Sequence, residues 1–325
     1  MKYNISKMIT ILAVNAWILP SWTSVEAATI NIACPGQTLQ SGIDAANPGD
    51  TVSVTGACVE NIIIRNEKVR IAIAGSGGAS VTGASSSSPV FNVRGKGIVI
   101  SGLTVSGGSN AIWVNRGSNV TIDNNTIQNA TSRGILITNN SFAVVTNNTI
   151  QNNTSDGIQV ADTGNAHIGF NVRSDTSASP NTITGNGDRG IQLSRGGSAR
   201  IIGNTISNNA SDGILVNRLS VADIASNIIN GNGTAFVGGN TDGNGINVSQ
   251  NSSVQLGEDN PVDFFDQPNT TTVNNANAGI RCTLGGVVRG HLGNTNQVNG
   301  TVSQFGGGST VNTLSGTCPN SLVTP

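Results

Sequence analysis

The apolar positions of this chain recur in short segments with a period of two residues, separated by turns rich in Asn, Gly and Ser. The clearest signal is a glycine followed by an apolar-x-apolar triplet. Its copies are Gly134 to Ile137, Gly157 to Val160, Gly190 to Leu193, Gly213 to Val216 and Gly245 to Val248, with related segments at 111–114 and 279–282. Segments of this length and period are typical of β-strands and are too short for helices.

The spacing of these segments indicates a repeating unit of 23 residues. Counted from Ile112, the leading isoleucines are 23, 23, 33, 23, 32 and 34 residues apart, so three units carry insertions of 10, 9 and 11 residues. Each unit has a second apolar segment eight to ten residues after the isoleucine, and a third that begins with Asn-Thr-Ile or a variant. Each unit therefore predicts three short strands.

Such short strands cannot bury an apolar face alone, so the units must stack and pair about 4.8 Å apart. This predicts an all-β fold, a single-stranded right-handed parallel β-helix with three strands per rung. The Asn residues of the third segments then form a column. We expect a structural role for it, because Asn tolerates a left-handed turn and its amide can bond the next rung. The column contains Asn125, Asn148, Asn181, Asn204 and Asn227.

The region before the repeats predicts a short helix, because Leu39, Ile43 and Ala46 fit one helical face. We expect this helix to cap the open end of the stack, with the first rungs beginning at Thr51. The expected organisation is a signal peptide at 1–27, an N-terminal cap at 28–60, the β-helix at 61–300 and a C-terminal cap or tail at 301–325.

Residues 1–27 have the pattern of a secretory signal, with Lys2 and Lys7 before an apolar run and a small-residue cleavage site. A membrane anchor is the alternative, but a run of about 12 apolar residues is too short to span a bilayer. We therefore expect a secreted or periplasmic protein, with attachment to the cell surface left open and no membrane span in the mature chain.

The four cysteines lie in two pairs after this leader, Cys34 with Cys58 and Cys282 with Cys318. An even count in an oxidising compartment favours a disulfide at each end of the chain. A zinc site is the alternative, but there is no CxxC motif and the two histidines are far apart in sequence.

Composition excludes several classes of protein. The chain has 42 Gly and only 10% charged residues, unlike helix bundles and coiled coils, and its 36% hydrophobic residues argue against disorder. The formal net charge is −1 and the sequence has no dense run of basic residues, so it lacks the positive cluster that binds nucleic-acid phosphates. We expect a monomer that does not bind nucleic acid.

Several motifs of the chain can be compared with known families: Leu39-Gln40, Pro48-Gly49-Asp50-Thr51, and the Asn-Thr-Ile and Asp-Gly-Ile units. With these motifs the chain resembles bacterial secreted right-handed parallel β-helix repeat proteins of the pectate-lyase-like superfamily. The similarity covers about residues 30–300. It implies the fold but leaves the activity open, since this superfamily contains polysaccharide lyases, glycoside hydrolases, uronate epimerases and adhesin-like proteins.

The residue before each repeated glycine alternates in charge, as Arg133, Asp156, Arg189 and Asp212. Stacked about 4.8 Å apart, these residues predict a surface ladder worth about 0.2–1 kcal/mol per pair. The alternative is an inverting glycosidase in which Asp156 and Asp212, about 9.6 Å apart, act as acid and base beside Arg189. We favour the ladder, because any repeat produces regular carboxylate spacings.

A further catalytic candidate is Asp242, because Asn240-Thr241-Asp242-Gly243 is similar to a polygalacturonase active-site tetrapeptide. That family also needs an Asp-Asp pair, a Gly-His-Gly and an Arg-Ile-Lys, and the sequence contains none of them. We therefore interpret the similarity as chance.

Candidate binding residues lie on the first strands and in the insertions. Trp113 points outward from a first strand, and Arg195 and Arg218 end two others, where they could hold uronate carboxylates or simply be solvated. Aromatic residues of the first and third insertions, Phe170 with Phe264 and Phe265, lie three rungs or about 14 Å apart on one side. They could flank an elongated ligand or cover the apolar flank of the coil, and we prefer the second interpretation.

The third insertion is acidic, and its carboxylates offer oxygens that suit a calcium ion. They are Glu258, Asp259, Asp263 and Asp266. No known calcium motif is present, so we expect no cofactor, with Ca²⁺ as the alternative.

The mature chain is poor in residues that serve sugar chemistry, with no Tyr, one Trp and two Lys after the leader. The leading hypothesis is therefore an exported β-helix scaffold that binds a polysaccharide or a cell-surface glycan. The alternative is a polysaccharide lyase, glycoside hydrolase or epimerase that acts on uronate-containing glycans. The sequence does not decide whether the protein is an enzyme.

Overall fold

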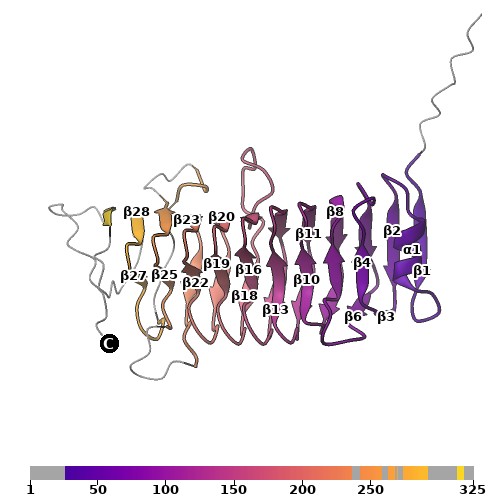
Figure 1. Cartoon of the computed structure of the whole chain (residues 1–325), viewed down its shortest axis with the longest axis horizontal. Helices are drawn as coiled ribbons and strands as arrows, with labels where there is room; N and C mark the ends of the chain where they lie inside the picture. The colour runs from indigo at the N-terminus through magenta and orange to yellow at the C-terminus, as the bar shows by residue number, and fades with distance from the viewer. Residues whose placement is uncertain are drawn as a thin grey trace, which may run out of the picture.

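The structure is a computed structural model, and it describes residues 26–235, 242–257, 263–267, 269, 274–291 and 313–317. The chain winds into an elongated coil whose strands stack along its length (Figure 1). Within the described residues, the strands form sheets A, B and C of 12, 8 and 9 strands. The expected β-helix with three strands per rung is confirmed. The predicted signal peptide lies outside the described residues except for its last two positions, and so does the predicted C-terminal segment except for 313–317.

The three sheets contain the following strands in spatial order. Sheet A contains β1 (Thr29–Ala33), β2 (Thr51–Thr55), β5 (Ala72–Gly75), β8 (Lys96–Ser101), β11 (Asn119–Asp123), β14 (Phe142–Thr146), β17 (Asn165–Ile168), β20 (Ser198–Ile202), β23 (Val221–Ala225), β26 (Ser253–Leu256), β28 (Val287–His291) and β29 (Thr313–Thr317). Sheet B contains β3 (Ala57–Val59), β6 (Ser80–Thr82), β9 (Thr104–Ser106), β12 (Thr126–Gln128), β15 (Thr149–Gln151), β18 (Thr182–Thr184), β21 (Thr205–Ser207) and β24 (Ile228–Asn230). Sheet C contains β4 (Ile62–Ile64), β7 (Phe91–Val93), β10 (Asn110–Val114), β13 (Arg133–Ile137), β16 (Ile158–Ala161), β19 (Ile191–Ser194), β22 (Ile214–Val216), β25 (Ile246–Val248) and β27 (Ile280–Cys282).

The register of sheet C confirms the repeat. Ile112 pairs with Ile135, and every later leading isoleucine pairs with the next as far as Ile280. This register holds in the longer units too, so the insertions leave the coil between strands without shifting it. The paired isoleucines and the inward residues of sheets A and B form one continuous apolar core.

The predicted Asn column is confirmed and continues from Asn125 to Asn269. In each rung the side-chain oxygen of the column Asn accepts a hydrogen bond from the backbone N–H of the column Asn in the preceding rung, as Asn181 does from Asn148 at 2.9 Å. One predicted reason was wrong. The left-handed backbone conformation belongs to the residue before the column Asn, for example Asn124 at φ 54°.

A second Asn column, which we did not predict, follows the strands of sheet B. It contains Asn153, Asn186, Asn209, Asn232 and Asn275, which repeat the same backbone-to-side-chain bonds. This column explains the repeated glycines. A Cβ on Gly190 would lie 2.9 Å from the Asn209 amide nitrogen and 2.7 Å from the carbonyl oxygen of Gly213, so no side chain fits there.

The N-terminal end is covered by α1 (Leu39–Ala45), as predicted, with Leu39 and Ile43 buried. The side chain of Gln40 accepts a bond from the N–H of Ile63 at 2.8 Å and donates one to its carbonyl at 3.1 Å. This amide thereby occupies the free edge of β4 as a neighbouring strand would. Sheet A itself begins with β1, earlier than the expected first rung at Thr51.

The predicted disulfide between Cys34 and Cys58 is confirmed and ties this end to the coil. Cys282 is disulfide-bonded as well. Its predicted partner, Cys318, lies outside the described residues.

Candidate functional site

The charged residues before the repeated glycines meet at one corner of the coil, as expected. Asp156 lies between two arginines, with Oδ2 3.5 Å from Arg133 Nε and Oδ1 3.8 Å from Arg189 Nη1. The carboxyl group of Asp156 is buried, whereas 31% of the Arg133 side chain is exposed. At these rungs the predicted stacking of opposite charges is confirmed.

The column of ion pairs stops at Arg189 and does not include Asp212. This corrects the prediction that Asp212 continues the stack of opposite charges. Within the described residues Asp212 forms no ion pair with Arg189. Its carboxylate instead accepts bonds from the Asn244 backbone at 2.8 Å, the Asn244 side chain at 2.7 Å and the Asn247 side chain at 3.0 Å. These bonds satisfy the carboxylate without a cation and fasten the end of the second insertion to the coil.

Burial controls the protonation of this corner. It raises the pKa of Asp156 to about 6, helped by the nearby Asp188 and opposed by Arg189 and Arg133. Burial also raises the pKa of Asp212, against the hydrogen bonds from Asn244 and Asn247. A carboxyl group with a pKa near 6 can hold a proton close to neutral pH, as a general acid must.

Asp188 belongs to this corner although we did not single it out from the sequence. Its Oδ2 is 2.6 Å from Arg189 Nη1, and its side chain is 34% exposed. Burial raises the pKa of Asp188, Arg189 opposes the rise and Asp242 adds to it. The sequence does mark Asp188 by a break in the repeat, because the equivalent positions 132, 155 and 211 hold serines.

The structure therefore brings the predicted catalytic residues into one neighbourhood. Asp242 acts electrostatically on both Asp188 and Asp212. Asp156 and Asp212 are almost fully buried, and the more accessible carboxyl groups are those of Asp188 and Asp242.

The outer face of sheet C lies beside this corner and presents one residue per rung. The row is uncharged from Ile63 to Asn247 and continues to Arg281; in register it contains Ile63, Asn92, Trp113, Leu136, Gln159, Gln192, Leu215, Asn247 and Arg281. The indole N–H of Trp113 donates to Thr138 Oγ1 at 3.0 Å, and the amides of Gln159 and Gln192 are hydrogen-bonded to each other. The row thus offers the partly exposed indole ring of Trp113 and the partly exposed amide of Gln192, whereas the side chains of Asn92, Gln159 and Asn247 are buried.

The opposite edge of sheet C is a turn whose left-handed residues include Arg116, Asp162, Arg195 and Arg218. Arg195 holds Asp162 with two bonds of 2.6 Å and 3.1 Å, and these bonds lower the pKa of Asp162. Arg218 is exposed and forms no ion pair with the described part of the chain. Of the two arginines predicted for binding, Arg218 is therefore the one available to a ligand.

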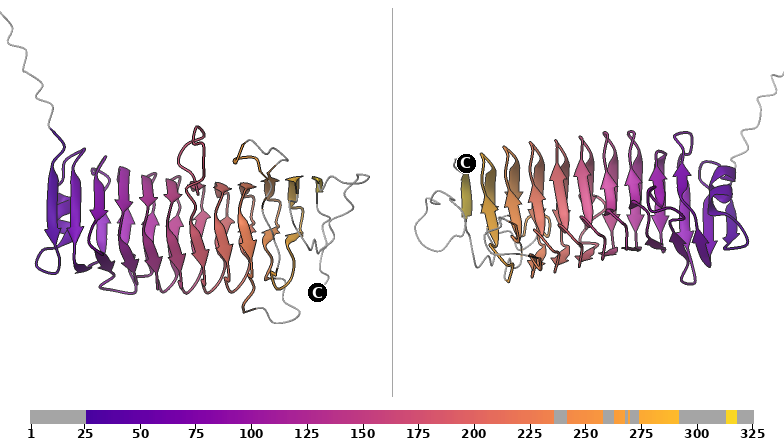
Figure 2. Two further views of the ribbon diagram at one scale, coloured as in Figure 1. Left: turned by 180° about the vertical axis from the view of Figure 1, so that it is seen from behind. Right: turned by 60° about the horizontal axis from the view of Figure 1, so that its bottom comes forward.

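The first and third insertions project from the same side of the coil (Figures 1 and 2). Their residues Phe170 and Phe265 form a buried cluster with Ile202 and Ala225 of sheet A. The rings of Phe170 and Phe265 meet edge to face with centroids 5.0 Å apart, and Phe264 packs on Phe265. Arg173 joins the two insertions through Asp263 at 2.8 Å. The aromatic residues thus cover the flank of the coil, the interpretation we preferred, and do not line an open cleft.

Comparison with known proteins agrees with this architecture. A family model described as a right-handed β-helix region matches residues 37–176 and 96–287. The chain belongs to this family. No curated protein sequence matches it.

Several solved structures resemble this right-handed β-helix protein. Pectate lyase Pel9A gives a TM-score of 0.51 at 16% identity over 81% of this chain and 74% of that chain. An alginate lyase from Paenibacillus sp. str. FPU-7 gives a TM-score of 0.38 at 18% identity, over 70% of this chain and 87% of that chain. ORF18 of Geobacillus virus E2 gives a TM-score of 0.47 at 9% identity, over 78% of this chain and 57% of that chain. At these identities the similarity concerns the fold alone.

The two described acids of the third insertion both lie beside an arginine in this β-helix protein. Asp263 and Asp266 face Arg173 at 2.8 Å and 3.7 Å, while Glu258 and Asp259 lie outside the described residues. Among described residues, metal-ligand spacing occurs only at Cys34, Cys58 and Glu60, and both sulfur atoms belong to the disulfide.

The described part of this β-helix protein contains no helix with the length and apolar character needed to cross a bilayer.

Proposed function

We propose that this right-handed β-helix protein is a scaffold that binds an elongated carbohydrate along the outer face of sheet C. The observation that carries the proposal is the row containing Trp113, which is uncharged from Ile63 to Asn247, continues to Arg281 and lies between two arginine-bearing edges. Sugars present C–H faces to an indole ring and hydroxyl groups to amides. Because rungs repeat about every 4.8 Å, successive units of a polymer would meet equivalent positions.

Two further features support this function. The solved structure named pectate lyase Pel9A shares the fold, and a pectate lyase acts on a carbohydrate. Arg218 is exposed at the edge of the face and forms no ion pair with the described residues, which suits a sugar that carries a carboxylate. The Cys34–Cys58 disulfide agrees with a secreted or periplasmic location, as the leader at 1–27 also predicts.

A second candidate is a polysaccharide-modifying enzyme, a lyase, hydrolase or epimerase that works at the charged corner. The pKa of about 6 for Asp156 favours it, because such a group could donate a proton while Asp188 or Asp242 accepts one. The burial of Asp156 between two arginines and the bonds that hold Asp212 argue against it. Neither carboxyl group is open to a sugar ring, so we favour binding without cleavage.

One experiment separates these functions. The secreted protein is incubated with uronate-containing and neutral polysaccharides, and both binding and new reducing or unsaturated chain ends are measured. We expect binding to at least one polymer without new ends. Trp113→Ala should weaken binding at least about tenfold through loss of the indole surface, whereas Arg173→Ala in the first insertion should not. New ends that disappear in Asp156→Asn or Asp188→Asn would instead establish the enzyme.

A further inference from the structure

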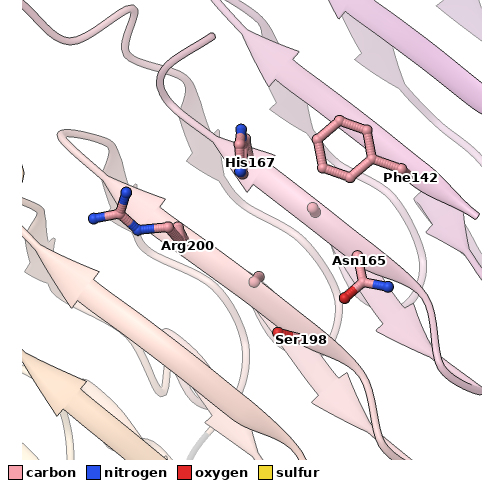
Figure 3. A pocket seen from close by; sticks show the side chains of 7 residues that line it. Phe142, Asn165, His167, Ser198 and Arg200 are labelled. Atoms are coloured by element: carbon pink, nitrogen blue, oxygen red, sulfur yellow. The ribbon is translucent and has the colours of Figure 1, made fainter. Parts of the chain in front are cut away.

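A pocket of about 320 Å³ opens on the outer face of sheet A, away from the proposed carbohydrate face (Figure 3). Phe142, His167 and Arg200 rise beside it from the neighbouring strands β14, β17 and β20. Phe142 is followed along its outward column by the smaller Asn165 and Ser198, and this fall in size leaves the hollow.

The aromatic side of the pocket is held in place by packing. The imidazole of His167 meets the Phe142 ring edge to face with centroids 5.1 Å apart. On its other side His167 stacks on Phe170 at 4.4 Å. Its Nδ1 lies 3.2 Å from the carbonyl oxygen of Asn171, which can only accept, so Nδ1 carries the proton and Nε2 is left for a ligand.

Arg200 supplies an anchored positive charge. Its Nε donates to Asp223 at 2.7 Å, and its guanidinium carbon lies 5.4 Å and 5.1 Å from the ring centres of Phe170 and Phe265. Neither Nη group donates a hydrogen bond to the described part of the chain, so the fork of donors that binds an oxyanion in bidentate fashion is unused. None of the residues lining the pocket is acidic.

We propose that this pocket binds a small ring compound that carries one oxyanion group, with the ring against Phe142 and the oxyanion on the Nη groups of Arg200. Ser198 and Asn165 would bond further polar substituents. An aromatic acid and a sugar acid share this chemistry, because each combines a ring face with an oxyanion. The site is independent of the carbohydrate face on sheet C.

The test uses His167, one of only two histidines in the chain, as a reporter. The imidazole NMR signals, assigned with a His167→Gln variant, are followed during titration with benzoate and with glucuronate. Benzyl alcohol and glucose serve as neutral counterparts. We expect a saturable shift with at least one of the two acids and none with the neutral compounds, and the responding acid identifies the kind of ring.

Variants locate the binding groups. Arg200→Lys keeps the charge but loses the planar fork, and we expect it to weaken binding about tenfold or more. Arg65→Lys, which lies beside the N-terminal helix, is the matched control and should bind as the wild type does. Ser198→Leu should fill the hollow and abolish binding while leaving the Arg200 contacts intact.

Two results would overturn the proposal. One is the absence of a shift with both acids, and the other is equal binding by the wild type, Arg200→Lys and Ser198→Leu. Trp113→Ala should leave this titration unchanged, so the outcome is distinct from that of the carbohydrate experiment.

Discussion

The Asn columns and the charged column occupy corners of the same coil, but only the Asn columns run without interruption. From Asn125 to Asn269 each rung repeats the same bonds, whereas the ion pairs reach from Arg133 to Arg189 and stop before Asp212. An amide both donates and accepts, so identical residues satisfy one another over any number of rungs. A buried charge needs an opposite partner and bears a cost of desolvation. Self-complementary columns build the fold, and the carboxyl groups with raised pKa values lie in the charged column and beside its end.

The largest test of this contrast is Asn204→Ala, inside the first Asn column. Asn204 accepts from the N–H of Asn181 and donates to the carbonyl of Ile168, and alanine would remove both of these buried bonds. We expect the free energy of unfolding to fall by about 2–4 kcal/mol, measured by urea denaturation. The exposed Asn171→Ala is the control and should stay within about 0.5 kcal/mol of the wild type. Equal effects at the two sites would contradict the structural role of the column.

A smaller effect should come from the titration of Asp156. Its folded pKa of about 6 lies above the unfolded value, so the folded state binds more protons between these pKa values. The stabilisation is fully present below the unfolded pKa and is lost as the pH rises through about 6. From pH 4 to pH 7 the wild type should lose about 2–3 kcal/mol more than Asp156→Asn.

The control for this titration is Asp162, whose pKa is lowered, chiefly by the hydrogen bonds from Arg195. The contribution of Asp162 to the free energy of unfolding changes with pH in the opposite direction, because it is present above the unfolded pKa and is lost as the pH falls through the folded pKa. Urea unfolding at a series of pH values measures the stability of Asp156→Asn and of the control variant Asp162→Asn. Parallel stability profiles for the wild type and Asp156→Asn would show that the carboxyl group is not perturbed by burial.

The smallest expected effect is that of Arg133→Gln at the exposed end of the charged column. Because Arg133 lowers the pKa of Asp156, its removal should raise that pKa further, while stability changes by less than about 1 kcal/mol. Titration of the Asp156 side-chain carbon by NMR measures the shift. Arg218→Gln, far from this carboxyl group in the repeat, should leave the titration unchanged. A lower pKa in Arg133→Gln would contradict the assigned interaction.

The fold was predictable because one constraint recurs in every rung. The pairing of Ile112 with Ile135 and the later isoleucines follows directly from the 23-residue period. The second Asn column escaped prediction because its neighbours vary, as Thr follows Asn153 but Gly follows Asn186. A period is visible only where the flanking residues repeat as well.

The candidate site was predictable only in part. The column position of Asp156 follows from the spacing, but its burial and protonation depend on packing. Asp212 is held by Asn244 at the return of an insertion whose path the repeat does not determine. In the same way, the separation of the first and third insertions follows from the rungs, while the contact between Arg173 and Asp263 depends on how the loops fold.

The fluorescence of Trp113 tests the proposed carbohydrate face most directly. Trp17 and Trp22 lie in the predicted leader, so the protein secreted without it carries Trp113 as its single tryptophan. During titration with a polysaccharide that it binds, we predict a saturable change in Trp113 emission that follows the bound fraction. Binding without any change in this emission would contradict the assignment of sheet C as the carbohydrate face.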